Sequence, residues 1–521
     1  IKAVHNHLVF NGGGRKNHSK AVANLAALCS GGSYDIPFVS IDSEAFRSKS
    51  ISGGSQRGFG APQAFLAIET SMDELAQKLQ MDPITLRKKN ILSLKHKTVM
   101  GGKIGNNPRL DEILDIARKH PLWKKYKLRK EEDGWIHGVG FAMAMQPFGA
   151  STDGMLGYVA LDSSGNIKVV SDAVDMGTGS ATTLAMIPAR RLGKNAVNIE
   201  MGRPSFFGKL GLISGKGEKW DNPRWVPRIS GSSGASTVAF QQVHAIESAA
   251  QVLADSSIIP AAIRIWKERG QTIRAEQVAI DETGVSAPYC DTLSLKEVAI
   301  AIKKYKLNRG AMIHASFRGK WVEADYHINH TRYHWPIDGL ALEDYKGAFH
   351  LVDRKNTKRY SQESQFYRRT HFSPCANIVE VKVNQNTGET KVLKVVSILN
   401  SGPLITPEFV EGQHEGGVAM AIGYALKEEV PLDKNGPANG KWNLDQYHIP
   451  LSDDVPYNNI ELICLAPEKG ETASRGIAEA VMCAVAPAIL NAVYDATQIR
   501  FTKLPVTPPK ILASLKSRNS R

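Results

Sequence analysis

The sequence predicts an α+β fold, because both strand-like and helix-like segments occur along it. The polar segment Ser163–Asn166 is typical of a hairpin turn between two strands, and Asn386–Gly388 resembles another such turn, with valines on both sides. Apolar residues spaced three and four apart predict helices near 236–253, 259–268, 294–304, 409–425 and 483–497. With 521 residues, the chain is long enough for two or more domains.

The first part of the chain mixes strand and helix. Val4–Phe10 alternates like a strand and ends at a glycine-rich turn. Asp82 and Pro83 supply a cap and a first-turn proline for a helix that runs to Lys89.

The domain boundary is predicted at a charged, aromatic stretch over 121–135, which we interpret as a linker. This divides the chain into residues 1–120 and 121–521. Within the second part, residues near 204–230 and 308–370 are rich in Lys, Arg, Trp, Tyr and Gly. We expect both stretches to be insertions outside the core.

A glycine-rich loop around Arg57 precedes a predicted helix. Arg57 offers a planar fork of donors suited to phosphate or carboxylate. Gly58 and Gly60 allow the backbone to approach a ligand closely. Behind the loop, helical spacing predicts one buried face made of Phe65, Ile68, Met72, Leu75 and Leu79. The pattern indicates an anion-holding loop, with a purely structural loop as the alternative.

Four more loops rich in glycine or hydroxyl groups stand before helical segments. They are Asp175–Ser180, Ser230–Thr237, Gly412–Gly417 and Ser474–Ala480. Singly each is a weak indication. Together they favour one large ligand with phosphates, held by backbone N–H groups, hydroxyls and an amide, as a nucleotide-bearing cofactor requires.

Glu479 is the best candidate for proton chemistry. Its neighbours in sequence are small or apolar, so loss of hydration is expected to raise the pKa of its carboxyl group toward the range of a general base. The alternative is an exposed glutamate that stabilises the first turn of a helix.

Composition excludes several other classes of function. The net charge is +14, but the basic residues are scattered and no aromatic-interleaved basic motif supports nucleic-acid binding. A basic patch that faces an acidic partner subunit is the better interpretation. No apolar run is long enough to span a membrane. The charge does not decide between cytoplasm and periplasm.

Cysteine and histidine patterns give no clear metal site. None of the five cysteines forms a C-x-x-C pair, so local iron–sulfur or zinc spacing is absent, and we expect buried small apolar residues. His327, His330 and His334 lie close in sequence, and a polar surface segment is a better interpretation of them than a metal site.

The order and spacing of the loops resemble the molybdenum-binding subunit of the xanthine dehydrogenase/aldehyde oxidase family. Ser55–Gln63 resembles its arginine-glycine-phenylalanine-glycine loop, and Gly177–Gly179 resembles its glycine-glutamine-glycine loop. Gly412–Gln413 matches a third cofactor loop, and Gly476–Glu479 resembles the loop of the active-site glutamate. Tyr34–Pro37 fits the stretch ahead of the arginine loop.

This resemblance implies molybdenum-cofactor-binding domains of the xanthine oxidase/aldehyde oxidase type. Residues 1–120 would be the C-terminal part of the first domain and residues 121–521 the second. The implied cofactor is molybdenum–molybdopterin, in bacteria usually the cytosine dinucleotide form, whose dithiolene holds the metal without a direct protein ligand. The residues implied to hold this cofactor are Arg57, Gly58, Gly177, Thr178, Ser233, Ser236, Gln413 and Ala478.

The resemblance also implies how the site works. Glu479 would be the base that activates water at the metal, Phe59 would face the substrate, and Phe148 is a candidate second aromatic wall. Electrons would pass to [2Fe-2S] clusters on a partner subunit, because this chain lacks cluster-binding cysteines. A further partner could carry FAD or, if it is a cytochrome, haem; this choice is left open.

Some positions depart from the family pattern. Thr178 stands where many relatives carry glutamine, Ala478 replaces a usual glycine, and Ala480 replaces a frequent proline. Leu25 occupies the place where purine-oxidising members carry a substrate-binding arginine, which disfavours xanthine. Family chains begin well before Ile1, so we expect a separate or lost polypeptide to carry the N-terminal half of the molybdenum domain.

The predicted function is the catalytic subunit of a molybdenum hydroxylase or dehydrogenase. It would oxidise aldehydes to carboxylic acids or hydroxylate N-heteroaromatic rings with oxygen from water, and these two substrate classes carry equal weight. The alternatives are a non-catalytic cofactor-binding half of a split enzyme and a purine dehydrogenase.

Overall fold

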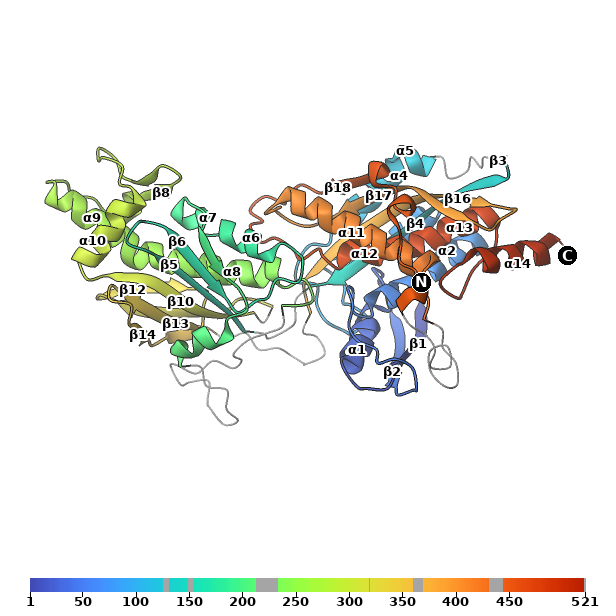
Figure 1. Cartoon of the computed structure of the whole chain (residues 1–521), viewed down its shortest axis with the longest axis horizontal. Coiled ribbons are helices and arrows are strands. Elements are labelled where there is room, and N and C mark those ends of the chain that lie inside the picture. The colour runs from blue at the N-terminus through green and yellow to red at the C-terminus, as the bar shows by residue number, and fades with distance from the viewer. Residues whose placement is uncertain are drawn as a thin grey trace. The chain divides into compact units, whose positions relative to one another are not determined.

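The computed structural model contains two compact units, each described here by itself (Figure 1). Unit 1 comprises Ile1–Phe148 and Thr370–Arg521, and unit 2 comprises Gly149–Arg369. The structure describes residues 1–124, 131–148, 154–211, 233–317, 319–358, 369–430 and 444–519.

The predicted boundary at residue 120 does not separate the two compact units. The strand that follows the expected linker, β4 (Trp135–Pro147), pairs with β16 (Phe372–Asn384) and packs with residues of the first 120 in one core. Long-range strand pairing therefore overrides the charged stretch that suggested a boundary. Of that stretch, Pro121–Lys124 forms the short helix α5, and 125–130 lie outside the described residues.

Unit 1 contains a five-stranded sheet with the strand order β18-β17-β16-β4-β3. Strands β4 and β16 are antiparallel along their whole length. β17 (Thr390–Leu399) continues antiparallel after the predicted turn at Asn386–Gly388, and β18 (Ile460–Cys464) runs parallel to β17. The remaining edge strand is β3 (Glu131–Glu132).

The helices of unit 1 are α1 Ser19–Cys29, α2 Ala61–Lys78, α3 Pro83–Lys88, α4 Leu110–Lys119, α5 Pro121–Lys124, α11 Pro407–Leu426, α12 Ala480–Cys483, α13 Val485–Thr497 and α14 Pro508–Asn519. Six of them, namely α2, α4, α5, α11, α12 and α13, pack on this sheet. The buried face predicted for α2 is confirmed at Phe65, Ile68 and Met72, whereas Leu79 follows the helix as its C-cap and is half exposed. The helices predicted at 409–425 and 483–497 are also confirmed.

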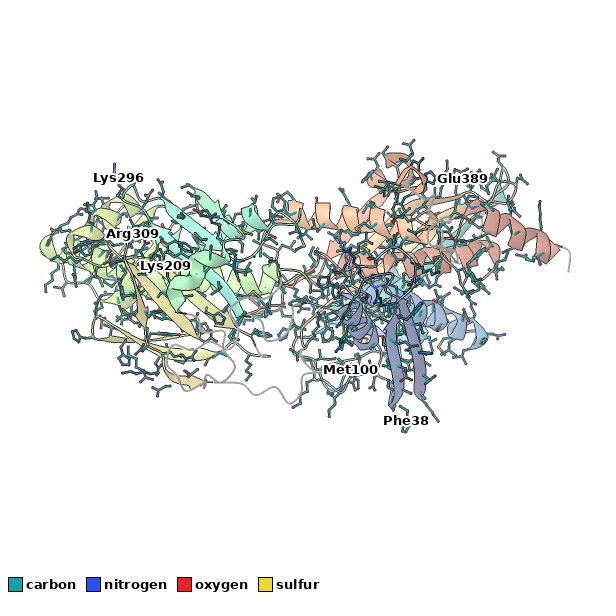
Figure 2. All side chains as sticks on the ribbon, turned by 60° about the horizontal axis from the view of Figure 1, so that its bottom comes forward. Phe38, Met100, Lys209, Lys296, Arg309 and Glu389 are labelled. Atoms are coloured by element: carbon teal, nitrogen blue, oxygen red, sulfur yellow. The ribbon has the colours of Figure 1, made fainter. Side chains whose placement is uncertain are left out.

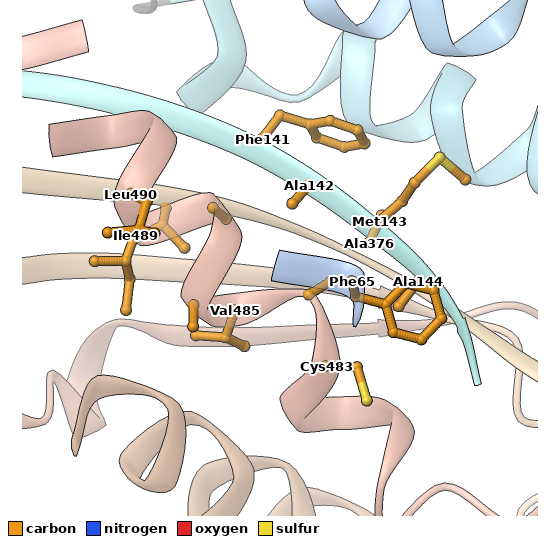
Figure 3. Packing of buried hydrophobic residues seen from close by; sticks show 14 of the residues in the cluster. Phe65, Phe141, Ala142, Met143, Ala144, Ala376, Cys483, Val485, Ile489 and Leu490 are labelled. Carbon is orange, nitrogen blue, oxygen red and sulfur yellow. The ribbon is translucent and has the colours of Figure 1, made fainter. Parts of the chain in front are cut away.

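Helix α13 packs directly on β4, and Figure 3 shows Ile489 and Leu490 of the helix near Phe141 and Ala142 of the strand. Two glycines of β4 allow this close approach. A Cβ atom on Gly138 would lie 2.1 Å from the carbonyl oxygen of Ala492, and one on Gly140 would lie 2.2 Å from that of Ala488. Asn491 donates to the Phe141 carbonyl at 3.0 Å, which fixes how far the helix can slide along the strand. The stretch Ala480–Thr497 is interrupted by Asn491 and Asp495 but is, on average, long and apolar enough to cross a membrane. Because 94% of it is buried inside the fold, it has the character of a core helix.

A buried ion pair ties α2, α3 and β4 together. Arg87 donates to the Glu69 carboxylate at 2.9 Å, and both side chains are fully buried. The same carboxylate accepts from the backbone N–H of Met143 at 2.9 Å and from the hydroxyl of Tyr34. Because each buried charge is neutralised and hydrogen-bonded, removing one partner is expected to cost about 3–5 kcal/mol.

Two strands of unit 1 form a separate parallel sheet. β1 (Ala3–Asn11) and β2 (Phe38–Phe46) pair in register from Ala3–Phe38 to Asn11–Phe46, and helix α1 packs against them. Burial alternates along both strands, so one face points away from the described part of unit 1. This face exposes Val9, Phe38 and Phe46. Figure 2 shows Phe38, the first residue of β2, projecting from the strand.

Unit 2 contains a six-stranded sheet with the order β14-β13-β10-β5-β6-β7. The strands are β5 Gly154–Leu161, β6 Ile167–Ser171, β7 Asn198–Glu200, β10 Asn308–Ser316, β13 Gly339–Asp344 and β14 Phe349–Val352. A three-stranded sheet adds β11 Glu323–Ile328, β12 Thr331–Trp335 and β15 Lys355–Lys358, and a hairpin adds β8 Ala279–Asp281 and β9 Gly284–Ser286. The turn predicted at Ser163–Asn166 joins β5 and β6, as expected.

The helices of unit 2 include the three predicted from periodicity. They are α6 Ser180–Met186, α7 Ala189–Leu192, α8 Val243–Leu253, α9 Ile259–Glu268 and α10 Leu295–Lys304. Helix α8 packs on β5 and β10, and a π-helical turn, Val238–Gln242, precedes it.

The prediction that 308–370 is an insertion outside the core is wrong. Strand β10 is a central strand of the large sheet, and its Ala311, Met312 and Ile313 are fully buried. Charged and aromatic residues of the following strands alternate with buried ones, which concealed the strand pattern. At 204–211, Phe207 and Leu210 are likewise buried, whereas 212–230 and 359–368 lie outside the described residues.

Candidate functional site

The guanidinium group of Arg57 joins three segments that are far apart in sequence. Its Nε donates to the carbonyl oxygen of Ala478, which precedes Glu479. Its Nη2 donates to the carbonyl oxygen of Gln413 at 2.7 Å and to the side-chain oxygen of Gln413 at 3.4 Å. Three predicted site segments therefore meet at one side chain.

Arg57 keeps one edge of its fork without an oxygen partner among the described residues. The hydrogen-bond partner of Nη1 is the Met420 sulfur at 4.0 Å. Burial lowers the pKa of Arg57, while the neighbouring Cys483 and Glu479 act in the opposite direction. A guanidinium edge in this position can donate to a ligand oxygen, as phosphate and pterin carbonyl groups require.

The backbone conformation of the Arg57 loop requires its two glycines. Gly58 and Gly60 have φ values of 87° and 94°, which favour glycine. A Cβ on Gly58 would lie 2.4 Å from the Pro62 ring, and one on Gly60 would lie 2.4 Å from the Val22 carbonyl oxygen. The close approach predicted from sequence is thus an approach to neighbouring protein atoms. Phe59 between them also has a positive φ, of 55°, which is strained for a bulky residue.

Glu479 lies at the N-cap of helix α12 and is 7% exposed. Its Oε2 accepts from the amide nitrogen of Gln146 at 3.1 Å, and its backbone carbonyl accepts from the Cys483 thiol at 3.2 Å. The exposed-glutamate alternative is therefore excluded. The rise in its pKa expected from sequence stays a prediction.

Gln413 lies on a helix rather than on a loop. The segment Gly412–Gly417 falls inside α11, so the loop interpretation of this segment is wrong. Gly412 has open space on its Cβ side, and His414 on the next position is buried against the Ser397 hydroxyl. Burial, assisted by the charge of Arg57, lowers the pKa of His414 to about 4.

The predicted substrate residues differ in how much surface they offer. Phe59 is partly buried, and its ring lies 6.1 Å from the ring of His18. Phe148 is 4% exposed and meets His371 edge-on at 6.2 Å. Leu25 is 3% exposed and belongs to the core, so it offers little surface to a substrate in this structure. Their roles toward a substrate stay predictions.

The remaining predicted cofactor residues lie in unit 2. The Asp175 carboxylate accepts from the backbone N–H groups of Gly177 at 2.9 Å and Thr178 at 3.1 Å, so these two groups already have partners. Thr178 shares a 2.7 Å hydrogen bond with the Ser180 hydroxyl, and Ser233 accepts from the Val174 N–H at 3.0 Å. The last contact brings the two predicted loops of unit 2 together.

Ser236 lies in the same region and has a φ of 56°, next to Ala235 at 57°. Two successive non-glycine residues with positive φ make a strained turn before the helical segment that follows. The preceding Gly231 and Ser232 lie outside the described residues.

No metal-binding side-chain cluster occurs in the described parts of the chain. Groups of three or more His, Cys, Asp or Glu residues suited to a metal ion are absent there. His334 pairs with Asp325 at 2.9 Å. Within the same residues none of the five cysteines forms a disulfide, and Cys29, Cys375 and Cys483 are buried as expected, whereas Cys290 and Cys464 are partly exposed.

The sequence matches two domain families, each described as a molybdopterin cofactor-binding domain. One matches residues 116–206 and 219–456, and the other matches residues 1–91. The chain belongs to the molybdopterin cofactor-binding family. The resemblance to the xanthine dehydrogenase/aldehyde oxidase family is confirmed.

Individual relatives are distant but cover nearly the whole chain. The xanthine dehydrogenase molybdenum-binding subunit of Escherichia coli O157:H7 is 24% identical over 518 residues, which are 97% of this chain and 57% of the relative. The nicotine 6-hydroxylase large subunit of Paenarthrobacter nicotinovorans is 24% identical over 537 residues, covering 99% of this chain and 58% of the relative. The chain thus spans a little over half of each.

The fold agrees with solved structures. The aldehyde oxidoreductase of Desulfovibrio gigas superposes with a TM-score of 0.70 at 19% identity, covering 99% of this chain and 47% of that one. The α+β architecture of molybdenum-cofactor-binding domains, predicted from sequence, is therefore confirmed.

One residue at the site, Gln146, escaped the sequence analysis. It donates to Glu479 from the end of β4 and is 1% exposed. The pattern that could have identified it is the series of small residues at alternate positions of β4: Gly138, Gly140, Ala142 and Ala144. Gln146 continues this face as its first polar member.

His414 makes the stability of the protein depend on pH. Its pKa is about 4 in the folded state, against an ordinary value near 6.5 in the unfolded chain. Between these values the unfolded chain binds a proton that the folded chain does not, so stability is lost as the pH falls from 6.5 to 4. Replacing His414 by Gln should reduce this loss by on the order of 1–3 kcal/mol.

Urea unfolding at pH 7 and pH 4.5 measures this difference. His327→Gln, at an exposed position, is the matched control and should leave the pH dependence unchanged. An identical loss of stability in His414→Gln and in the unsubstituted protein would contradict the assignment.

Proposed function

We propose that this chain is the molybdenum-cofactor-binding, catalytic part of a hydroxylase or dehydrogenase. The observation that carries the proposal is the nearly buried Glu479 carboxylate next to the Arg57–Gln413 contact. A carboxylate held close to cofactor-binding groups and shielded from water is suited to general-base chemistry. The names of the relatives, which include dehydrogenase, hydroxylase and aldehyde oxidoreductase, support this reaction class.

The donor groups of the site fit a molybdenum–pterin group, and we propose the cytosine dinucleotide form of it. Arg57 would donate from its Nη1 edge, Gln413 would present its amide, and Gly58 and Ala478 would line the approach. The residues of unit 2 that we propose for cofactor binding are Gly177, Thr178, Ser233 and Ser236. When bound, the group would supply an activated water oxygen and accept two electrons.

Glu479 would take the proton that water loses as its oxygen is transferred to the substrate. Gln146 and Cys483 hold its carboxylate and its backbone carbonyl, so the base needs little reorganisation before it acts. Phe59 would face the substrate: its strained backbone is the kind of outlier that supports a functional role. Phe148 would form a second aromatic wall of the substrate site. Leu25, which is buried, would lie behind the surface of that site. Aldehydes and N-heteroaromatic rings remain the two substrate classes.

A partner chain that carries the N-terminal half of the molybdenum domain would cover the β1–β2 sheet. Two-stranded sheets are marginal alone, and parallel sheets are normally buried on both faces. Val9, Phe38 and Phe46 are instead exposed on this one. We infer that additional strands and apolar side chains of the partner complete it.

A cationic cavity beside this sheet favours an acidic segment on that partner. The cavity has a volume of about 730 Å³, and its charged lining residues are Arg15, Lys16, Lys20 and Arg47, with no carboxylate.

We propose that an iron–sulfur subunit takes the electrons from the site, and that an FAD or cytochrome subunit is a further partner.

The role of Glu479 is tested by Glu479→Gln. General-base catalysis contributes about 10²–10⁴-fold, so turnover should fall at least 100-fold while molybdenum and pterin content stay near normal. The measurement is dye reduction by the purified holoenzyme together with metal and pterin analysis. Glu415→Gln, an exposed position on α11, is the control and should keep full activity.

Substantial turnover in Glu479→Gln would contradict its role as the base. Loss of turnover together with loss of the cofactor would indicate a structural role instead. The same assay, run on aromatic aldehydes and on nicotinate-like heterocycles, decides between the two substrate classes.

The partner surface is tested by Phe38→Asp. A charge on the exposed face of β2 should weaken association at least tenfold, because an apolar contact is replaced by a desolvated carboxylate. Size-exclusion chromatography of the complex measures this, with Val197→Asp, an exposed position in unit 2, as the control. An unsubstituted chain that runs alone at 56.9 kDa, fully loaded and active, would contradict the proposal.

A further inference from the structure

One face of strand β4 leads directly to the Glu479 carboxylate. Side chains alternate across a strand, so every second residue from Gly138 to Gln146 faces the same side. Gly138 and Gly140 contact the backbone of α13 on this side, and Gln146 reaches Glu479 at the start of α12. Only glycine or alanine precedes Gln146 on the face, which lets the helix lie close along the strand.

The amide of Gln146 is fixed from both ends. Its Nε2 donates to Glu479 Oε2 at 3.1 Å, and its Oε1 accepts from the Cys483 thiol at 3.6 Å. Gln146 is 1% exposed and Cys483 is fully buried. The thiol has one hydrogen, which it shares between this amide oxygen and the closer Glu479 carbonyl oxygen at 3.2 Å. The amide nitrogen points at the Glu479 carboxylate because an ionised carboxylate can only accept a hydrogen bond.

The neighbouring strand holds the other end of the same loop. Ser373 on β16 lies opposite Gln146 in the strand register. Its hydroxyl donates to the Gly476 carbonyl at 2.6 Å. Ser373 and Gln146, which face each other in the sheet, therefore hold the same loop at two points. These points, Gly476 and Glu479, are three residues apart.

We propose that Gln146 is a positioning residue that orients the Glu479 carboxylate and stabilises its ionised form. This inference rests on the proposed function of Glu479 as the base, but the contact itself belongs to the folded protein. A hydrogen bond donated to the ionised carboxylate opposes the cost of burying it. Without the amide, that burial cost would be less well compensated.

The charged and titratable groups around Glu479 come from several elements. Arg57, on the loop before α2, and Cys483, on α12, interact electrostatically with it. Cys29 on α1 and Cys375 on β16 face Cys483 in turn. His414 on α11 responds to Arg57 and is buried as the neutral ring. Among these groups Arg57 is the cation that interacts with the Glu479 carboxylate, and Gln146 is the neutral group that donates a hydrogen bond to it.

Gln146→Met tests the proposal, because it preserves the volume but removes the amide. Its matched control is Met145→Leu, whose side chain lies on the opposite face of β4. The carboxyl titration of Glu479 is followed by infrared difference spectroscopy of cofactor-free protein, with Glu479→Gln as the reference. In Gln146→Met the midpoint should rise by about one pH unit, and in Met145→Leu it should not move.

The pH profile of kcat/KM of the holoenzyme should show the same displacement of its acidic limb. Gln146→Asn, whose shorter amide cannot reach Glu479, should reproduce the shift if Gln146→Met fails to fold. An unchanged titration midpoint in a folded Gln146 variant would overturn the proposal.

The two proposals fail in different ways. If Glu479→Gln keeps its turnover but Gln146→Met still shifts the carboxyl titration, the positioning contact stands and the catalytic role of Glu479 falls. If Glu479→Gln is inactive and the titration does not shift, only the role of Gln146 falls.

Discussion

The site depends on the half-buried guanidinium group of Arg57. Its hydrogen bonds connect positions 356 and 421 residues away in sequence, on α11 and in the glutamate loop. Burial of a cation is tolerated only when carbonyl or carboxylate oxygens replace its hydration. The carbonyls of Gln413 and Ala478 do so, and their positions fix the loop that carries Glu479.

A second constraint comes from the packing of α13 on β4. Gly138 and Gly140 let helix and strand touch, while Asn491 and Asp495 bind the β4 backbone at Phe141 and Val139. The register between helix and strand is therefore set by hydrogen bonds as well as by shape. Because this register is fixed, Glu479, which precedes α12, meets Gln146 near the end of β4. Arg57, Gln413 and Glu479, which we propose to bind the cofactor and to accept a proton, therefore share one framework in unit 1.

The sequence predicted what depends on local patterns. Helical periodicity identified α8, α9, α10, α11 and α13, and loop motifs identified Arg57, Gln413 and Glu479, which meet in the folded chain. Features that depend on tertiary packing were missed. Strand β10 was taken for an insertion, because its burial comes from neighbours distant in sequence.

The glycines of the Arg57 loop and residue Gln146 illustrate the same limit at single positions. Gly58 and Gly60 have the positive φ values that glycine permits. The atoms that pack closely against them belong to Pro62 and Val22. Gln146 is an unremarkable amide in sequence, and only the pairing of β4 with β16 and α13 brings it to Glu479. Leu25 fitted a family position, yet the fold buries it in the core.

The most direct test of the account is the cofactor content of Arg57→Ala compared with Arg57→Lys. A charge-assisted hydrogen bond to the cofactor is worth about 1.5–3 kcal/mol, so pterin and molybdenum affinity should fall roughly 10- to 150-fold in the alanine variant. Lysine keeps the charge but loses the planar fork, and it should restore only part of the occupancy. Metal analysis and pterin fluorescence of the purified, folded variants measure both. Full occupancy in Arg57→Ala would contradict the claim that this side chain organises the site.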